Sequence, residues 1–222
     1  MTDREANRRI TLIEKRADMT DKAFHAHWSG PHAEIARDLP GLVWYVQNHV
    51  QNVLWPQGQE VRHLGIAEIA FRDPKDIFHR IDGWARVDEL RKDEGRFLSA
   101  RYGCWTHAHD APVLPSQRRI VVQFGQPTGD SADKVRRRIA DQAAWIATEF
   151  PCHVEDCIGG SPDVLDDPPG CFLFVELPAT GDIGSLMSNG LAPLRDLGVS
   201  AIAHVVHAEA KRLPIDLTLT AP

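Results

Sequence analysis

The 222-residue sequence lacks the features that define several large functional classes. No apolar run approaches the roughly 20 residues of a membrane-spanning helix. The charged start, MTDREANRR, is not followed by the apolar core of a signal peptide. The net charge is −6, and the longest basic run, Arg136 to Arg138, has acidic neighbours. We therefore expect neither a membrane partner nor the basic face that binds nucleic acid.

Cysteine is scarce, and its spacing is not that of a zinc site. The four residues are Cys104, Cys152, Cys157 and Cys171, with no CxxC pair among them. We expect reduced, mostly buried thiols in a cytoplasmic protein. The sequence also lacks a GxSxG elbow, a phosphate loop, a GxGxxG fingerprint and an HExxH motif, which disfavours the chemistries that depend on them. We predict no metal ion and no cofactor.

Strand and helix patterns occur twice in the same order: strand, helix, strand, strand, helix, strand. In the first half the predicted ranges are 9–16, 20–39, 42–50, 63–71, 73–99 and 101–109. In the second half they are 119–126, 130–150, 152–158, 171–177, 182–197 and 200–210. The stretch APVLPSQ, residues 111–117, is typical of a linker. We therefore predict two modules, residues 8–110 and 118–210.

A βαββαβ unit is the ferredoxin-like plan, a four-stranded antiparallel sheet with both helices on one face. The strands at 63–71 and 171–177 are apolar on both faces apart from one glutamate each, which indicates sheets covered on both sides. We predict an α+β fold in which the two tandem ferredoxin-like modules cover each other and enclose a barrel-like cavity. Closure within one chain is favoured over pairing between chains, and a homodimer would use exposed edge strands.

The first half carries an ordered set of short motifs. They are KR (15–16), FxxxW (24–28), PHA (31–33), LPGL (39–42), YVxNHV (45–50), GIAEIAF (65–71) and DEGRFL (93–98). Together they resemble the EthD family of the dimeric α+β barrel superfamily, over about residues 8–110. Residues 118–210 lack these motifs and resemble the fold alone.

The resemblance implies a ferredoxin-like barrel with a small apolar cavity. Relatives include cofactor-free isomerases, cyclases, decarboxylases and monooxygenases that act on lactones, polyketides and aromatic rings, and others bind haem. In muconolactone-isomerase-like relatives a catalytic histidine lies on the first helix shortly before the PGL turn, and His32 occupies that position. The aspartate usual before GIAE is Leu64 here, beside His63.

His32 is the leading candidate for chemistry, because histidine moves protons near neutral pH. It falls on one helical stripe with Phe24 and Trp28, so it should face the sheet, and Pro31 interrupts the helix just before it. The alternative is a core histidine bonded to backbone. His25 and His27 lie off the stripe and are expected in solvent.

Tyr45, Gln47 and His49 share one face of the second predicted strand, because side chains alternate along a strand. Facing a cavity, this row would supply proton donors and acceptors. The alternative for His49 is a strand end in solvent. We predict His32, His49 and Tyr45 as catalytic residues. The predicted substrate-binding residues are Trp28, Gln47, Trp105, His63 and His107.

Four other side chains are less clear. Glu68 and Glu176 occupy matching places in two apolar strands, where a carboxylate is costly unless paired. We favour structural roles for both, for instance as a partner of Arg16. His204 and His207 lie on opposite faces of the last strand, so one of them should face the interior.

Three functional hypotheses follow. The first is a cofactor-free isomerase, dehydratase or carbon–carbon lyase of aromatic or polyketide-like metabolism, acting on a small apolar, aromatic or lactone substrate in the barrel cavity. The second is a haem protein with peroxidase-like or haem-degrading activity, with His32, His204 or His207 as ligand. The third is a non-catalytic binding module in which the second half serves as a lid.

Overall fold

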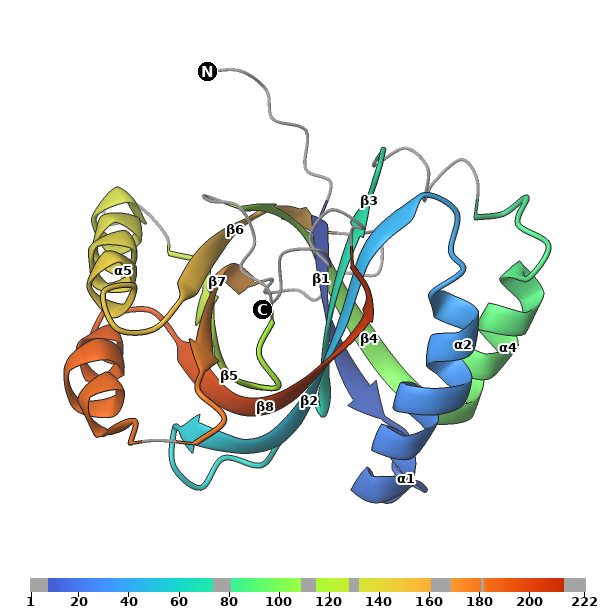
Figure 1. Cartoon of the computed structure of the whole chain (residues 1–222), viewed down its shortest axis with the longest axis horizontal. Helices are drawn as coiled ribbons and strands as arrows, with labels where there is room; N and C mark the ends of the chain where they lie inside the picture. Colours follow the sequence, from blue (N-terminus) through green and yellow to red (C-terminus); the bar gives the residue numbers. More distant parts are fainter. Residues whose placement is uncertain are drawn as a thin grey trace.

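The computed structural model describes residues 8–73, 81–108, 115–127, 132–160, 169–180 and 182–213. Its strands form a closed eight-stranded barrel in the order β1-β3-β2-β8-β5-β7-β6-β4 (Figure 1). The strands are β1 (Arg8–Lys15), β2 (Leu42–Trp55), β3 (Gly65–Phe71), β4 (Leu98–Ala108), β5 (Arg118–Gly125), β6 (Cys152–Gly160), β7 (Pro169–Leu177) and β8 (Ala201–Arg212). The predicted α+β barrel is confirmed.

Both halves use the same strand order. The first half is β4-β1-β3-β2, and the second half, read from its own last strand, is β8-β5-β7-β6. Two antiparallel seams join the halves, β2 with β8 and β4 with β6. Within this chain the two sheets therefore close on each other, as the doubly apolar strands predicted.

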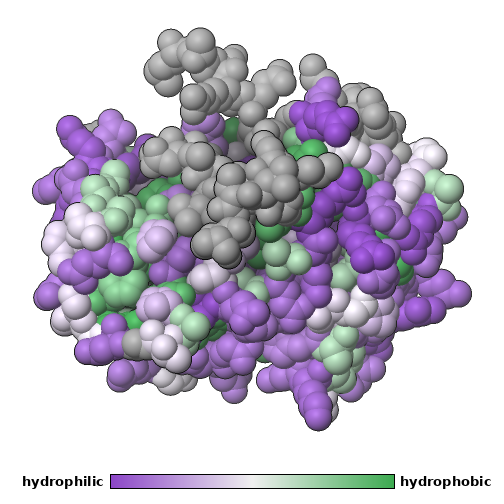
Figure 2. All heavy atoms as spheres, viewed as in Figure 1, coloured by the Kyte–Doolittle hydropathy of each residue, from purple (hydrophilic) through white to green (hydrophobic). Residues whose placement is uncertain are grey.

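Helices cover the barrel on opposite sides, as Figure 1 shows. On the first half they are α1 (Asp21–His27), the π-helical η1 (Trp28–His32), α2 (Ala33–Ala36) and α4 (Val87–Phe97); on the second, α5 (Ala132–Ile146), η3 (Leu186–Leu191) and η4 (Ala192–Leu194). Each layer packs a hydrophobic core against the outer face of its own sheet. In Figure 2, hydrophobic side chains gather mainly over the second half. In the described ranges no helix has the length and apolar character of a membrane span.

Several predicted boundaries are wrong for local reasons. β2 continues to Trp55, so residues 51–55 are strand and not loop. The helix predicted at 73–99 begins only at Val87 in the described chain, after turns around residues 81–86. The helix predicted at 182–197 is instead a π-helical turn followed by a 3-10 turn, because Gly190 and Pro193 disfavour a regular α-helix. Residues 74–80, 109–114 and 130–131, which include most of the predicted linker, lie outside the described residues.

The inside of the barrel is filled, and not hollow as the sequence analysis expected. Nine buried apolar side chains from both halves pack together there: Ile10, Leu12, Val50, Ile66, Cys104, Val121, Phe172, Phe174 and Val206. Above them lies a set of buried charged groups. The part of the barrel interior that these residues occupy is therefore a core that holds the two halves together.

Two arginines and three glutamates form this buried charged cluster. Arg8 on β1 contacts Glu68 at 2.9 Å and Glu155 at 3.0 Å. Arg119 on β5 contacts Glu68 at 2.5 Å and Glu176 at 2.7 Å. Each arginine thus bridges carboxylates of different strands, and Glu68 joins the first half to the second. Glu68 and Glu176 are therefore structural, as predicted, because each is paired with a buried arginine. Arg16, which was suggested as their partner, pairs with Asp18 instead.

Within the cluster, the two arginines stabilise the charge of Glu68. Burial alone would raise the pKa of Glu68, but Arg119 and Arg8 outweigh it and hold this pKa at about 2. Asn48 adds a hydrogen bond to the same carboxylate at 2.8 Å. Leaving one buried member without its partner is strongly destabilising, because the remaining charge is then uncompensated.

We therefore predict that Arg119→Met destabilises the protein by about 3–5 kcal/mol, the cost typical of breaking a buried ion pair. Arg118→Met is the matched control, since Arg118 is the preceding residue on β5 and is only partly buried. Urea unfolding of both variants and the wild type measures the difference. Equal losses in the two variants would show that the buried cluster is not what closes the barrel.

Candidate functional site

The first helix carries the leading candidate on an irregular turn. Thr20 caps α1 by accepting a hydrogen bond from the Ala23 amide at 3.2 Å. The helix then widens into the π-helical turn η1, which contains Pro31 and ends at His32. Proline has no N–H and disfavours regular α-helix, and π-helical turns are frequent at functional sites. The irregularity expected at Pro31 is present and directly precedes His32.

The carbonyls of this turn are bonded to the barrel. Gln47 on β2 donates to the Trp28 carbonyl at 2.8 Å, and the Lys211 ammonium on β8 donates to the Ser29 carbonyl at 2.8 Å. Gly65 on β3 lies against the Trp28 ring, where a Cβ would come within 2.7 Å of it. The turn that presents His32 is therefore held by both halves of the chain.

A pocket of about 120 Å³ lies between these helices and the outer face of the first sheet. Its floor is formed by β1, β2, β3 and β4, and its walls by η1, α2 and α4. The lining is mainly apolar, and its polar side chains are Arg9, Thr11, His32, Tyr45, Glu94 and Arg101. The apolar and aromatic lining residues are Ile13, Trp28, Ala36, Leu39, Ala67, Ile69, Ile81, Leu90, Phe97 and Leu98.

His32 is held by a buried aspartate. Its Nδ1 atom lies 3.0 Å from one carboxylate oxygen of Asp93 on α4, and His27 Nε2 lies 2.9 Å from the other. Burial raises the pKa of Asp93, but the hydrogen bonds from His32 and His27 outweigh this and hold the pKa below its usual value. An ionised Asp93 accepts from Nδ1–H, so neutral His32 carries its lone pair on Nε2. Among the described residues nothing hydrogen-bonds that atom.

Tyr45 lies in the same pocket as a hydrogen-bond donor. Its hydroxyl oxygen accepts from Gln47 Nε2 at 2.6 Å, so its own hydrogen remains available to a bound molecule. Burial raises the pKa of Tyr45, which keeps the hydroxyl protonated. The pocket thus combines a proton acceptor, His32 Nε2, with a neutral donor, the Tyr45 hydroxyl.

Comparisons with known proteins agree with the sequence motifs and the barrel. Residues 16–101 match the profile of the EthD domain. This span contains η1, Asp93 and every lining residue of the pocket except the three on β1, namely Arg9, Thr11 and Ile13. The resemblance found in the sequence is therefore confirmed for this part of the chain. No curated protein matches the chain significantly.

Solved structures share the fold over almost the whole chain. An anthrone oxidase-like protein has a TM-score of 0.59 at 11% identity, covering 97% of this chain and 98% of its own. A proposed monooxygenase from Fusobacterium nucleatum subsp. nucleatum ATCC 25586 has 0.57 at 7%, covering 93% and 95%. Another from Lactobacillus acidophilus NCFM has 0.55 at 11%, covering 94% and 95%. At these identities the likeness establishes the fold alone.

The structure places three of the predicted site residues at the EthD-domain pocket, namely His32, Tyr45 and Trp28. Gln47 stands behind Tyr45 and orients it. His49 faces the same helix layer, but it does not line the pocket. The centroid of its ring lies 4.7 Å from that of the Trp28 ring. His49 is buried, so it is not the solvent-exposed strand end that was the alternative, but it does not line the pocket with His32.

The remaining predicted binding residues do not line the pocket. Trp105 packs against the edge of the first core, and His107 is a partly buried residue near the end of β4. His63 precedes β3 and lies beside Glu14 and the Tyr102 ring. A position at the end of a strand therefore does not by itself indicate that a residue lines the pocket, because other edges of the barrel also consist of strand ends.

The sequence analysis did not single out Asp93 or give a role to His27, although Asp93 begins the DEGRFL motif. His27 was expected in solvent, yet it bonds Asp93. Asp93 is followed directly by Glu94, and two successive helical carboxylates carry no sign in the sequence of which one is more deeply buried. The signal that could have found Asp93 is the DEGRFL motif itself, because an acidic residue within a family motif is a candidate partner for His32.

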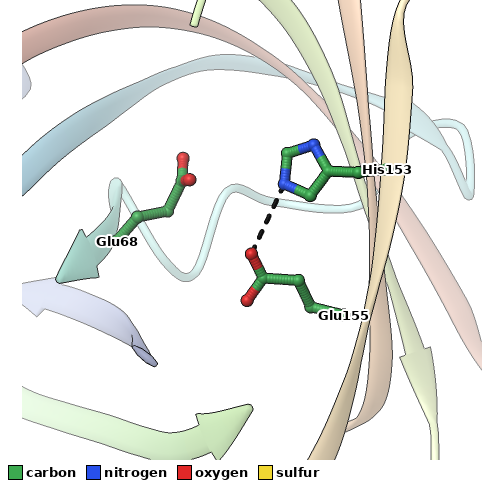
Figure 3. Close-up of side chains that lie close together, drawn as sticks. All are labelled: Glu68, His153 and Glu155. Carbon is green, nitrogen blue, oxygen red and sulfur yellow. Dashed lines mark ion pairs between the residues drawn. The ribbon is translucent and has the colours of Figure 1, made fainter. Parts of the chain in front are cut away.

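A second cluster of ligand-type side chains lies inside the barrel. Glu68, His153 and Glu155 point toward one another from β3 and β6, as Figure 3 shows. His153 Nε2 lies 3.4 Å from Glu155. Arg8 already bridges the two carboxylates, so a guanidinium holds the place where a metal cation would bind. We interpret this cluster as part of the charged core.

Three other histidines are buried and neutral at pH 7. Burial lowers the pKa of His49, of His63 and of His204 to about 4. An unfolded histidine has a pKa near 6.5. Below pH 6.5 the unfolded chain therefore binds protons that the folded chain excludes. This part of the stability is complete above pH 6.5 and is lost as the pH falls toward about 4.

We predict a steep loss of stability in this acidic window, to which each of these histidines contributes up to about 1.4 kcal/mol per pH unit. Urea unfolding at pH 7.5, 6.5 and 5.5 gives the slope. His204→Gln removes one titrating group and should flatten the slope by about that amount. The same slope in His204→Gln and wild type would mean that His204 is protonated in the folded protein.

Proposed function

We propose that the pocket of the EthD domain is the active site of a cofactor-independent acid–base enzyme. The observation that carries the proposal is the buried Asp93–His32 pair, which fixes the tautomer of a histidine whose free nitrogen belongs to an apolar pocket. An aspartate that holds a histidine in this way makes it a directed general base. Tyr45, protonated and oriented by Gln47, complements it on the same pocket wall.

The arrangement supports removal of a proton from carbon next to a carbonyl. His32 Nε2 takes the proton, and the electron pair of the broken C–H bond moves to the carbonyl oxygen. The Tyr45 hydroxyl donates a hydrogen bond to that oxygen and stabilises the enolate. Returning the proton to another carbon gives an isomer, while passing it to a departing hydroxyl gives an elimination product and water. Both outcomes need no oxidant.

The pocket also limits the substrate. A cavity of roughly 150 Å³ accommodates benzene, and the space here is about 120 Å³. Because this space is smaller than the benzene cavity, a five-membered lactone or a small cyclic ketone suits it best. The polar groups Arg9, Glu94 and Arg101 at the pocket wall suit an oxygenated ring and not a hydrocarbon.

Haem does not fit this site. His32 is committed to Asp93 through Nδ1, and the space beside its free nitrogen corresponds to one small ring and not to a macrocycle. Of the other two proposed ligands, His204 is buried within the barrel, and His207 is about half exposed and lines a separate pocket of about 730 Å³ with Gln51 and Arg118. The structure therefore supports no haem-dependent step at the pocket.

The experiment is solvent-deuterium exchange followed by NMR, with unsaturated five-membered lactones and cyclic 1,3-diketones as probes. We expect the wild type to exchange the proton next to the carbonyl of at least one probe. His32→Gln should slow this exchange by about 10²–10⁴-fold, the range for a lost general base, and Tyr45→Phe by about 10²-fold. Asp93→Asn should slow it as well, because the amide no longer fixes the tautomer.

His107→Gln is the control, because His107 lies outside the pocket lining. Exchange that continues at the wild-type rate in His32→Gln would contradict the assignment of the base. Saturable binding of a probe without exchange in the wild type would favour the alternative of a non-catalytic binding module.

A further inference from the structure

Two thiols from different halves of the chain lie together inside the barrel. The Sγ atom of Cys157 on β6 is 3.3 Å from the Sγ atom of Cys104 on β4. Strand β4 belongs to the first half and β6 to the second, and the two cysteines are 53 positions apart in the sequence. The spacing of the four cysteines gives no sign of this pair, so the fold alone creates it.

The pair lies at an irregular point of the seam between the halves. Cys104 is opposite Gly160, whereas Cys157 is opposite Thr106, two residues further along β4. The register shifts between these positions, which leaves Ile158 on β6 without an opposite residue. An extra residue of this kind bends its strand and increases the local twist. The diagonal neighbours Cys104 and Cys157 are thereby brought together on the inner face.

Both sulfur atoms belong to the apolar core of the barrel, but they differ in depth. Cys104 is 3% exposed, and Cys157 packs against the same core while remaining only partly buried. The Cys157 thiol donates to Cys104 Sγ, and the Cys104 thiol donates to the Ile10 carbonyl at 3.7 Å. A small reagent from solvent therefore meets Cys157 first, with Cys104 directly behind it.

The other two cysteines are directed away from this pair. Cys152 lies five residues before Cys157 on the same strand, so alternation places it on the opposite face. There its thiol donates to the Ala143 carbonyl on α5 at 3.2 Å. Cys171 on β7 belongs to the outer core, beneath the helices of the second half. Cys104 is therefore the thiol best placed to react with Cys157.

We propose that Cys104 and Cys157 form a redox-sensitive modification site, which a hydroperoxide oxidises to a disulfide that links the two halves of the barrel. The Cys157 thiolate attacks one peroxide oxygen, the O–O bond breaks, and Cys157 becomes a sulfenic acid with release of water. The Cys104 sulfur then attacks the Cys157 sulfur, the S–S bond forms, and the S–O bond breaks with release of a second water. The two thiols lose two electrons and two protons, and hydrogen peroxide is reduced to two molecules of water.

The surroundings of the pair keep it reduced at rest. The hydrogen bond to Cys104 and burial both raise the pKa of the Cys157 thiol above its ordinary value. Because the thiolate is the reactive form, oxidation is slow at neutral pH and becomes faster as the pH rises. The resting dithiol agrees with the reduced thiols expected from the sequence, and a reducing dithiol restores it after oxidation.

The disulfide reinforces the shorter of the two seams. In the part of the chain that the structure describes, five residue pairs join β4 to β6, against nine that join β2 to β8. A cross-link between distant residues stabilises a protein mainly by restricting its unfolded chain. The site is independent of the proposed function, because neither cysteine lines the candidate pocket.

The test treats the full chain, purified in its reduced form, with excess hydrogen peroxide and maps the product by mass spectrometry. Cleavage after acidic residues, without reduction, separates the four cysteines, so each possible disulfide joins a different pair of peptides. We expect a mass lower by two hydrogens, a Cys104–Cys157 peptide pair, and a Tm that rises on oxidation and returns with dithiothreitol. The rate should increase about 10-fold from pH 7 to pH 8, because the thiolate is the nucleophile.

Cys104→Ser and Cys157→Ser should each abolish this disulfide. Cys152→Ser is the matched control, since it changes another partly buried thiol of β6, and it should form the disulfide like the wild type. The proposal is overturned if the treated wild type keeps four thiols, if Cys157 stops at a sulfenic or sulfinic acid, or if the mapped disulfide joins Cys157 to Cys171. These outcomes are read from the wild type, so they do not depend on how the serine variants fold.

Discussion

The buried bridge from Arg8 and Arg119 to the three interior glutamates is the constraint on which the rest of the structure depends. Each guanidinium contacts carboxylates on different strands, and Glu68 contacts both. A carboxylate inside a barrel is strongly destabilising unless a group of opposite charge is buried beside it. The two halves can therefore close in essentially one register, the one in which β1 and β3 present Arg8 and Glu68 to Arg119 and Glu155.

A filled interior decides where a ligand can bind. Because Phe172, Phe174 and the charged cluster occupy the space between the two sheets, the cavity is moved outward, to the layer between the first sheet and its helices. There the irregular turn η1 forms part of the pocket wall with Trp28 and His32. The second half contributes to this site from behind, since Lys211 holds the Ser29 carbonyl and Arg212 holds the Arg37 carbonyl.

More of the architecture than of the candidate site could be predicted from the sequence. The repeated order of elements and the doubly apolar strands give the closed barrel, because burial on both faces leaves few other solutions. His32 was found from its helical stripe and from the family motif. The hollow interior was predicted wrongly, because pattern alone shows that a strand face is buried and does not show what fills it. Asp93 was missed for a related reason: its partner lies 61 residues away, on another helix.

His25, His27, His32 and His49 lie close together in the sequence, but the structure divides them between two separate hydrogen-bonded groups. His25 and His27 are two residues apart, and an α-helix turns successive residues by about 100°, so they face different surroundings. His27 joins His32 at Asp93, beside the pocket. His25 joins His49 at the β2–β8 seam, near Glu209.

The Trp28 ring lies between these two groups of histidines, since it lines the pocket and also contacts the His49 ring. One helix therefore separates the histidines into two pairs: His27 and His32 are bonded to Asp93, and His25 and His49 are bonded to each other. A substitution that affects one group need not affect the other, because Trp28 and the backbone of η1 separate their hydrogen-bond networks.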